Sequence, residues 1–122
     1  MKRLSVALAT LCTAALAHAA PGPTNAVIAT TLEPQKIHEE CLRLEPGEQR
    51  RYHWKSDAPV DFNIHYHRGA EVIYPVKRDG MRGDGGTFTA KTAEDYCWMW
   101  SARMAPARIE GAITKKNRGQ TT

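Results

Sequence analysis

Strict alternation of apolar and polar residues marks the middle of this chain. The apolar positions are Val60, Phe62, Ile64 and Tyr66, and the polar positions between them are Asp61, Asn63, His65 and His67. A period of two is typical of a β-strand with one buried face. The segment Val60–His67 is therefore predicted to be a strand, with its apolar residues in the core and its polar residues facing solvent.

Further short runs with strand-forming residues are bounded by turn signals such as Glu45-Pro46-Gly47-Glu48 and Arg68-Gly69. In chain order the predicted strands are Glu39–Leu44, Gln49–Trp54, Val60–His67, Glu71–Lys77, Thr87–Ala90, Asp95–Ser101 and Ala107–Ile113. Pro75 indicates an edge position or a bulge. The glycine-rich stretch Asp79–Gly86 is predicted to be a mobile loop. About seven short strands without a helical period predict an all-β fold, a small antiparallel β-sandwich.

Three large aromatic residues, Tyr96, Trp98 and Trp100, share one face of a predicted strand. Such residues bury a large area each, which suits the core of a small domain. We expect them in the core; the alternative is a platform for a ligand.

The N-terminus has the three parts of a secretory signal. Lys2 and Arg3 precede an uncharged apolar stretch, Leu4–Ala17, and Ala17-His18-Ala19 is an A-x-A cleavage site. The apolar stretch is shorter than the roughly 20 residues that span a bilayer. We therefore predict a signal peptide at residues 1–19; the alternatives are a retained membrane anchor, a buried helix or a lipid anchor on Cys12.

The remaining chain is divided into three parts. Residues 20–36, which are rich in proline and small residues, are predicted to be a linker or flexible arm, 37–114 the β-sandwich domain, and 115–122 a polar basic tail. Loss of Lys2 and Arg3 lowers the net charge from +4 to +2, which is too small and scattered to indicate nucleic-acid binding. The sequence thus predicts a periplasmic or secreted protein with no membrane span after cleavage.

Two cysteines, Cys41 and Cys97, remain after removal of the signal peptide. In an oxidising compartment an even pair is expected to form a disulfide. Two free thiols or a two-cysteine metal site are the alternatives.

No catalytic motif is complete, so no catalytic residues are assigned, and a non-catalytic role is favoured. The sharpest chemical feature is His65-Tyr66-His67, because residues two apart on a strand point to the same face and could offer two imidazoles to zinc, copper or iron. Glu71, across the turn, and His53, on the preceding strand, are candidate third and fourth ligands. The alternative is that the histidines are ordinary surface residues.

The stretch from His65 through His67 and Glu71 to Gly80 resembles the first metal motif of the cupins. The chain lacks the glycine that usually precedes the first histidine of that motif. It also has no histidine after His67 to provide the second cupin motif. The resemblance therefore covers one half of the family's metal site.

A wider resemblance runs from Glu40 to Ile113. Its motifs are Cys41-Leu42, Pro46-Gly47-Glu48, Val60–Ile64, Gly69, Glu71-Val72-Ile73, Thr87-Phe88-Thr89 and Asp95-Tyr96-Cys97-Trp98. The pattern resembles the GOLD domain, the lumenal β-sandwich of ER–Golgi cargo receptors, in which the two cysteines form a disulfide. It implies a sandwich fold and a general role in protein or lipid binding. No coiled coil or membrane anchor follows in the sequence, so the receptor role is not implied.

Three functions are consistent with these observations. The first is a small non-catalytic binding module with an unknown protein or lipid partner in a bacterial cell envelope. The second is a metal-binding protein or cupin-like enzyme that holds Zn or Cu through His65, His67 and Glu71. The third is a structural component of the envelope.

Overall fold

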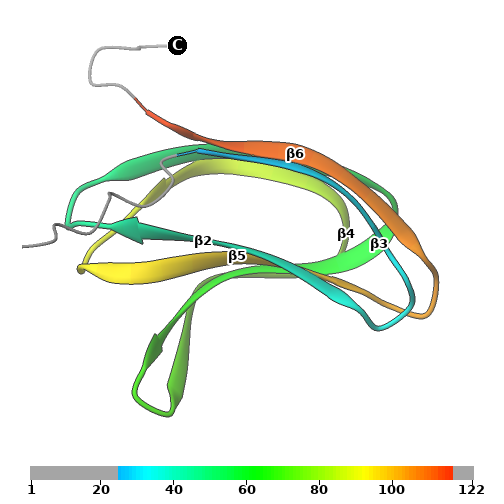
Figure 1. Ribbon diagram of the computed structural model, residues 1–122, viewed down its shortest axis with the longest axis horizontal. Helices are drawn as coiled ribbons and strands as arrows, with labels where there is room; N and C mark the ends of the chain where they lie inside the picture. Colours follow the sequence, from blue (N-terminus) through cyan, green and yellow to red (C-terminus); the bar gives the residue numbers. More distant parts are fainter. Residues whose placement is uncertain (1–24, 117–122) are drawn as a thin grey trace, which may run out of the picture.

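The computed structural model describes residues 25–116, which form six antiparallel strands and no helix (Figure 1). The strands are β1 (Ala26–Leu32), β2 (Ile37–Leu44), β3 (Gln49–Arg68), β4 (Glu71–Thr89), β5 (Glu94–Ala102) and β6 (Ala107–Lys115). Within this range no helix is long and apolar enough to cross a membrane. The predicted all-β antiparallel class is confirmed. The predicted signal peptide lies outside the described residues.

Strand β3 belongs to both layers of the sandwich. Its first part pairs with β6, up to the pair of Ser56 with Ile109, and its second part pairs with β5, starting from the pair of Val60 with Ala102. Strand β4 accompanies β3 on its other side through both parts. Strand β1 extends the first layer beside β6, and β2 extends the second beside β5 (Figure 1). The result is one strongly curled sheet folded into two facing layers.

The apolar period of two continues through both halves of β3 and builds the core. Tyr52 and Trp54 face inward from one layer, and Phe62 and Ile64 face inward from the other. The Trp54 and Phe62 ring centroids lie 5.2 Å apart, so the aromatic residues of the two layers pack directly on each other. Trp98 and Trp100 are at most 1% exposed, which confirms their assignment to the core.

The prediction of two separate strands, Gln49–Trp54 and Val60–His67, is wrong, because both belong to one strand. Residues 57–59 lie where β3 changes partner from β6 to β5, and they have no ladder partner. Pro59, which lacks an N–H group, is therefore accommodated without loss of a ladder hydrogen bond. The turn signal marks a bend within a strand.

The mobile loop predicted at Asp79–Gly86 is also wrong. This segment is part of β4, which continues to Thr89 and so includes all but the last residue of the predicted strand Thr87–Ala90. A Cβ atom at Gly83 would stand 3.0 Å from the Trp54 carbonyl oxygen. Glycine at this position permits the close approach of two strands. The glycine-rich sequence therefore reflects close strand packing and not a mobile loop.

Two domain boundaries also differ from the prediction. Residues 26–32 of the predicted linker form β1, which pairs with β6 along its whole length and buries Ile28 and Leu32 in the core. At the other end, Lys115 is the last residue of β6 and does not belong to a tail. Residues 117–122 of that predicted tail lie outside the described range.

Candidate functional site

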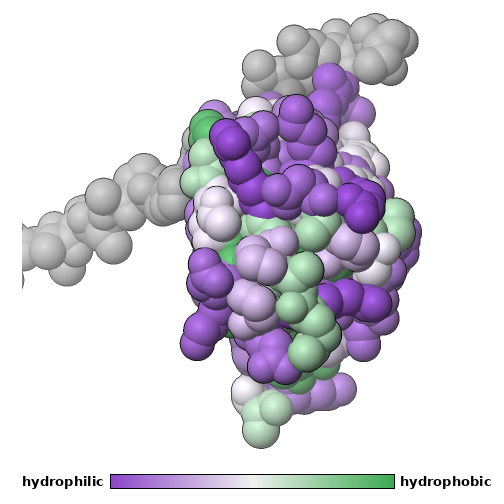
Figure 2. Space-filling view, turned by 90° about the vertical axis from the view of Figure 1, so that its right-hand side faces the viewer, coloured by the Kyte–Doolittle hydropathy of each residue, from purple (hydrophilic) through white to green (hydrophobic). Residues whose placement is uncertain are grey.

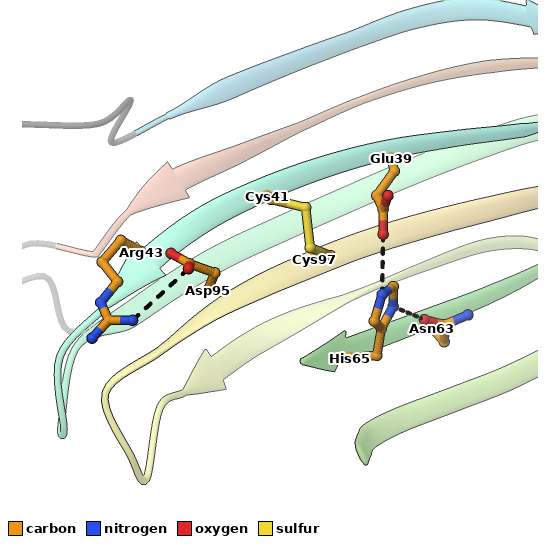
Figure 3. Close-up of a disulfide and its surroundings, with 7 residues drawn as sticks. All are labelled: Glu39, Cys41, Arg43, Asn63, His65, Asp95 and Cys97. Atoms are coloured by element: carbon orange, nitrogen blue, oxygen red, sulfur yellow. Dashed lines mark hydrogen bonds and ion pairs between the residues drawn. A yellow bond between two sulfur atoms is a disulfide. The ribbon is translucent and has the colours of Figure 1, made fainter. Parts of the chain in front are cut away.

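A row of three residues crosses the outer surface of the layer formed by β2, β5 and β3. Cys41 on β2 lies opposite Cys97 on β5, and Cys97 lies opposite His65 on β3. The two cysteines form the predicted disulfide, which closes a separation of 56 residues (Figure 3). Because directly opposed residues share a face of the sheet, the imidazole of His65 stands beside the disulfide.

His65 is the centre of a polar network on this outer face. Its Nε2 lies 3.0 Å from Oε1 of Glu39, and its Nδ1 lies 2.8 Å from Oδ1 of Asn63 (Figure 3). His65 is 4% exposed and Asn63 is 7% exposed. The expectation that these residues face solvent is therefore wrong. The ring of Tyr74, with its centroid 5.8 Å from that of His65, packs against this network and helps to shield it from water.

Burial lowers the pKa of His65, and this effect exceeds the opposing attraction of the Glu39 carboxylate; the neighbouring His67 lowers the pKa further. The ring is consequently neutral at pH 7. A neutral imidazole has one donor and one acceptor, so Nε2–H donates to Glu39 and Nδ1 accepts. Because Nδ1 accepts, its partner must be the amide nitrogen of Asn63. A half turn of the Asn63 amide, which exchanges its oxygen and nitrogen positions, provides this donor.

The four predicted metal ligands are not brought together. His67 lies beside His65, with ring centroids 5.2 Å apart, and it is exposed. Glu71 lies opposite Arg68, whereas the residue opposite His67 is Val72. Since opposed residues share a face, Glu71 is on the other face of the hairpin from His67. His53 pairs with Ala112, on the outer surface of the other layer.

Within residues 25–116, the cluster of metal-capable side chains that the structure does form consists of Glu39, His65 and Cys97. Cys97 is in the disulfide and offers no thiolate. Sequence reasoning missed Glu39. Its position two residues before Cys41 is the signal that could have found it, because pairing Cys41 with Cys97 fixes the register of β2 on β5.

The end of the β3–β4 hairpin projects beyond the network. Pairing of β3 with β5 ends at His65, so the backbone of the residues after it pairs with β4 alone. The projection leaves the two layers as a two-stranded arm (Figure 1). Tyr74 on this arm is 47% exposed, and the Arg68 guanidinium stacks over the Tyr66 ring at 5.6 Å.

Large exposed hydrophobic residues are few and scattered over the described part of the chain. They are Val27, Ile37, Tyr74 and Met104, each from a different strand or turn. The end of the sandwich seen in Figure 2 shows pale hydrophobic residues mixed with hydrophilic ones. Of these residues Tyr74 is the aromatic one, and it is the one that lies on the projecting arm.

Comparison with known proteins identifies a similarity in fold. No family model matches it, and no curated protein matches its sequence. Among solved structures it is similar to Aeromonas hydrophila PliG, a periplasmic lysozyme inhibitor of g-type lysozyme. The TM-score is 0.59 at 11% identity, over 76% of this chain and 87% of that chain. At this identity the similarity is one of fold.

Proposed function

We propose that this chain is an exported, non-catalytic binding module whose partner is a protein of the cell envelope, in the manner of a lysozyme inhibitor. Its fold is similar to that of PliG, which is a periplasmic inhibitor of g-type lysozyme. The Cys41–Cys97 disulfide supports export, because such bonds persist in oxidising compartments. The resemblance to GOLD domains supports the same general role, since it implies protein or lipid binding.

The observation that carries this proposal is the projecting end of the β3–β4 hairpin. Its exposed residues include His67, Arg68 and Tyr74. Tyrosine and arginine are enriched among the residues that dominate protein interfaces. At the base of the projection the buried residues Asn63 and His65 contact each other, and His65 also contacts Glu39 on β2. A pre-organised projection lowers the entropy cost of binding a complementary cleft.

The test uses a panel of lysozymes of the g-type and of other types. Inhibition by the mature protein is measured by the clearing of a cell-wall suspension, and binding is measured by direct titration of each lysozyme with the mature protein. Tyr74→Ala and Arg68→Ala should each weaken inhibition about tenfold or more. Val27→Ala, which trims another exposed hydrophobic residue on β1, is the matched control and should have no effect. Undiminished inhibition by Tyr74→Ala would place the contact surface elsewhere, and absence of binding to every lysozyme would refute this class of partner.

Metal binding is the alternative function, and the adjacency of His65 and His67 favours it. Glu39, which contacts His65, would replace Glu71 as the carboxylate ligand. Binding of zinc or copper would have to displace the hydrogen bond between His65 and Glu39. Calorimetric titration with Zn²⁺ and Cu²⁺ tests this: submicromolar binding that is lost in a His65→Ala, His67→Ala variant supports the site, and equal weak binding by both proteins excludes it.

A further inference from the structure

A buried cation that forms no ion pair with any described residue lies at the end of the sandwich next to the β2–β3 turn. Arg50, on β3, is 2% exposed. Its Nη1 donates to the Gln49 carbonyl oxygen at 3.0 Å, but its Nε is buried without a hydrogen-bond partner among the described residues. None of the ion pairs formed within residues 25–116 includes Arg50. A buried guanidinium is strongly unfavourable unless an anion compensates it.

A second cation lies directly across from Arg50. Lys115 on β6 is its register partner, so both side chains start from the same face of the sheet. Like charges in directly opposed positions of neighbouring strands repel each other. Lys116 follows at the same end, where its backbone N–H donates to the Gln49 carbonyl oxygen at 3.4 Å.

These three cations line one hollow of about 380 Å³, together with the turn at residues 46–49. One acidic residue, Glu48, also lines it, and its Oε2 accepts a hydrogen bond from the Glu45 backbone N–H at 2.8 Å. Among the described residues that line the hollow, positive charges therefore exceed negative charges by two. Its volume is within the range of sites that hold small molecules.

We propose that this hollow is a binding site for a phosphate group. A phosphate carries close to two negative charges, which matches the surplus of the hollow. Its oxygens can accept charge-assisted N–H bonds from the Arg50 guanidinium, while the lysines act as point charges. A singly charged carboxylate would leave part of the surplus uncompensated. The site lies on the β3–β6 pairing, away from the row formed by Cys41, Cys97 and His65.

The experiment is titration of the mature protein with inorganic phosphate at pH 7.5 and constant ionic strength, followed by amide NMR shifts and by the thermal unfolding midpoint. Saturable shifts are expected in the turn at 46–49 and at Lys115 and Lys116. The midpoint should rise with phosphate and should not rise with chloride of equal ionic strength, because a ligand that binds only the folded state stabilises it.

Arg50→Met and the double variant Lys115→Met, Lys116→Met should each weaken phosphate binding about tenfold or more. Without phosphate, Arg50→Met should unfold at the same temperature as the unaltered protein or higher, because a buried unpaired charge has been removed. Lys36→Met, which removes an exposed lysine outside the hollow, is the control and should bind phosphate normally. If Arg50→Met does not fold, the double lysine variant still tests the site.

Vesicles containing phosphatidylglycerol form the second arm of the test. Vesicle binding that depends on Arg50 and Lys115 would identify the phosphate as part of a lipid headgroup. Saturable phosphate binding without vesicle binding would identify a soluble phosphorylated ligand. An equal response to chloride, or phosphate shifts that are unchanged in both variants, would overturn the proposal.

Discussion

Gly111 of β6 lies directly opposite Trp54 of β3, so close that a Cβ atom at position 111 would stand 2.7 Å from the Trp54 Cβ. Real Cβ atoms are essentially never this close to another atom. The obstructing atoms are backbone and Cβ atoms of His53 and Trp54, which cannot easily move aside. We therefore expect Gly111→Ala to lower the free energy of unfolding by about 1–3 kcal/mol. Urea denaturation measures this change.

Gly86→Ala is the matched control on the neighbouring strand. A Cβ there would meet the Tyr52 hydroxyl oxygen at 3.8 Å, an ordinary contact distance. Its effect should stay within about 0.5 kcal/mol. Equal stability of the two variants would contradict the tight packing of β6 on β3.

Removal of the disulfide should destabilise the fold substantially. The bond closes a separation of 56 residues, for which the chain-entropy model gives about 4 kcal/mol. We expect Cys41→Ser and Cys97→Ser each to lower the free energy of unfolding by about 2–5 kcal/mol. Denaturation of each variant beside the oxidised and reduced protein tests this, and non-reducing peptide mapping verifies the bond. Two free thiols in protein purified from the periplasm would refute the pairing.

Stability should fall as the pH is lowered through the ordinary pKa range of histidine. Burial lowers the pKa of His65 in the folded state, so the unfolded chain binds the extra proton first. The stabilising contribution is complete above the unfolded pKa near 6.5 and declines as the pH falls from there towards the folded pKa. Denaturation between pH 8 and 5 should show this decline, and His65→Gln should flatten it. A slope that is unchanged in His65→Gln would assign the effect to another group.

Phe62 and Asn63 are neighbours on β3 that point to opposite faces, and both are buried. Phe62→Ala opens a cavity in the core and should cost about 3–5 kcal/mol. Asn63→Ala leaves His65 Nδ1 without its partner, and we expect a cost of about 1–3 kcal/mol. Denaturant midpoints of the two variants test both values. A neutral Asn63→Ala would restore the solvent-facing position that the alternation predicted.

The inner faces of the strands could be predicted because burial imposes a period of two, as the residues from Val60 to Tyr66 show. The outer face could not, because the burial of Asn63 and His65 depends on Glu39 and Tyr74, which come from other strands. Sequence spacing placed Glu71 near His67, but the two-residue turn pairs His67 with Val72. Ligand sets of this kind depend on register, which one sequence does not specify.

The strand boundaries failed for a related reason. Proline and glycine in the sequence predict strand ends. In the structure β3 continues through residues 57–59 while its partner changes from β6 to β5, and β4 stays paired with β3 in both layers. The small residues of β1 give little signal by themselves. They become a strand because β6 provides a hydrogen-bonded edge for all seven of them.

The pairing of β1 with β6 also determines the order in which the fold can close. Ala26 lies opposite Ile113, so β1 and its partner β6 come from opposite ends of the described chain. The β3–β4 hairpin is local and can form early, whereas the β1–β6 ladder joins distant segments and is a late, slow step. Until this ladder forms, the edge of β6 that faces away from β3 is unpaired and open to other chains, which makes the partly folded protein prone to aggregation.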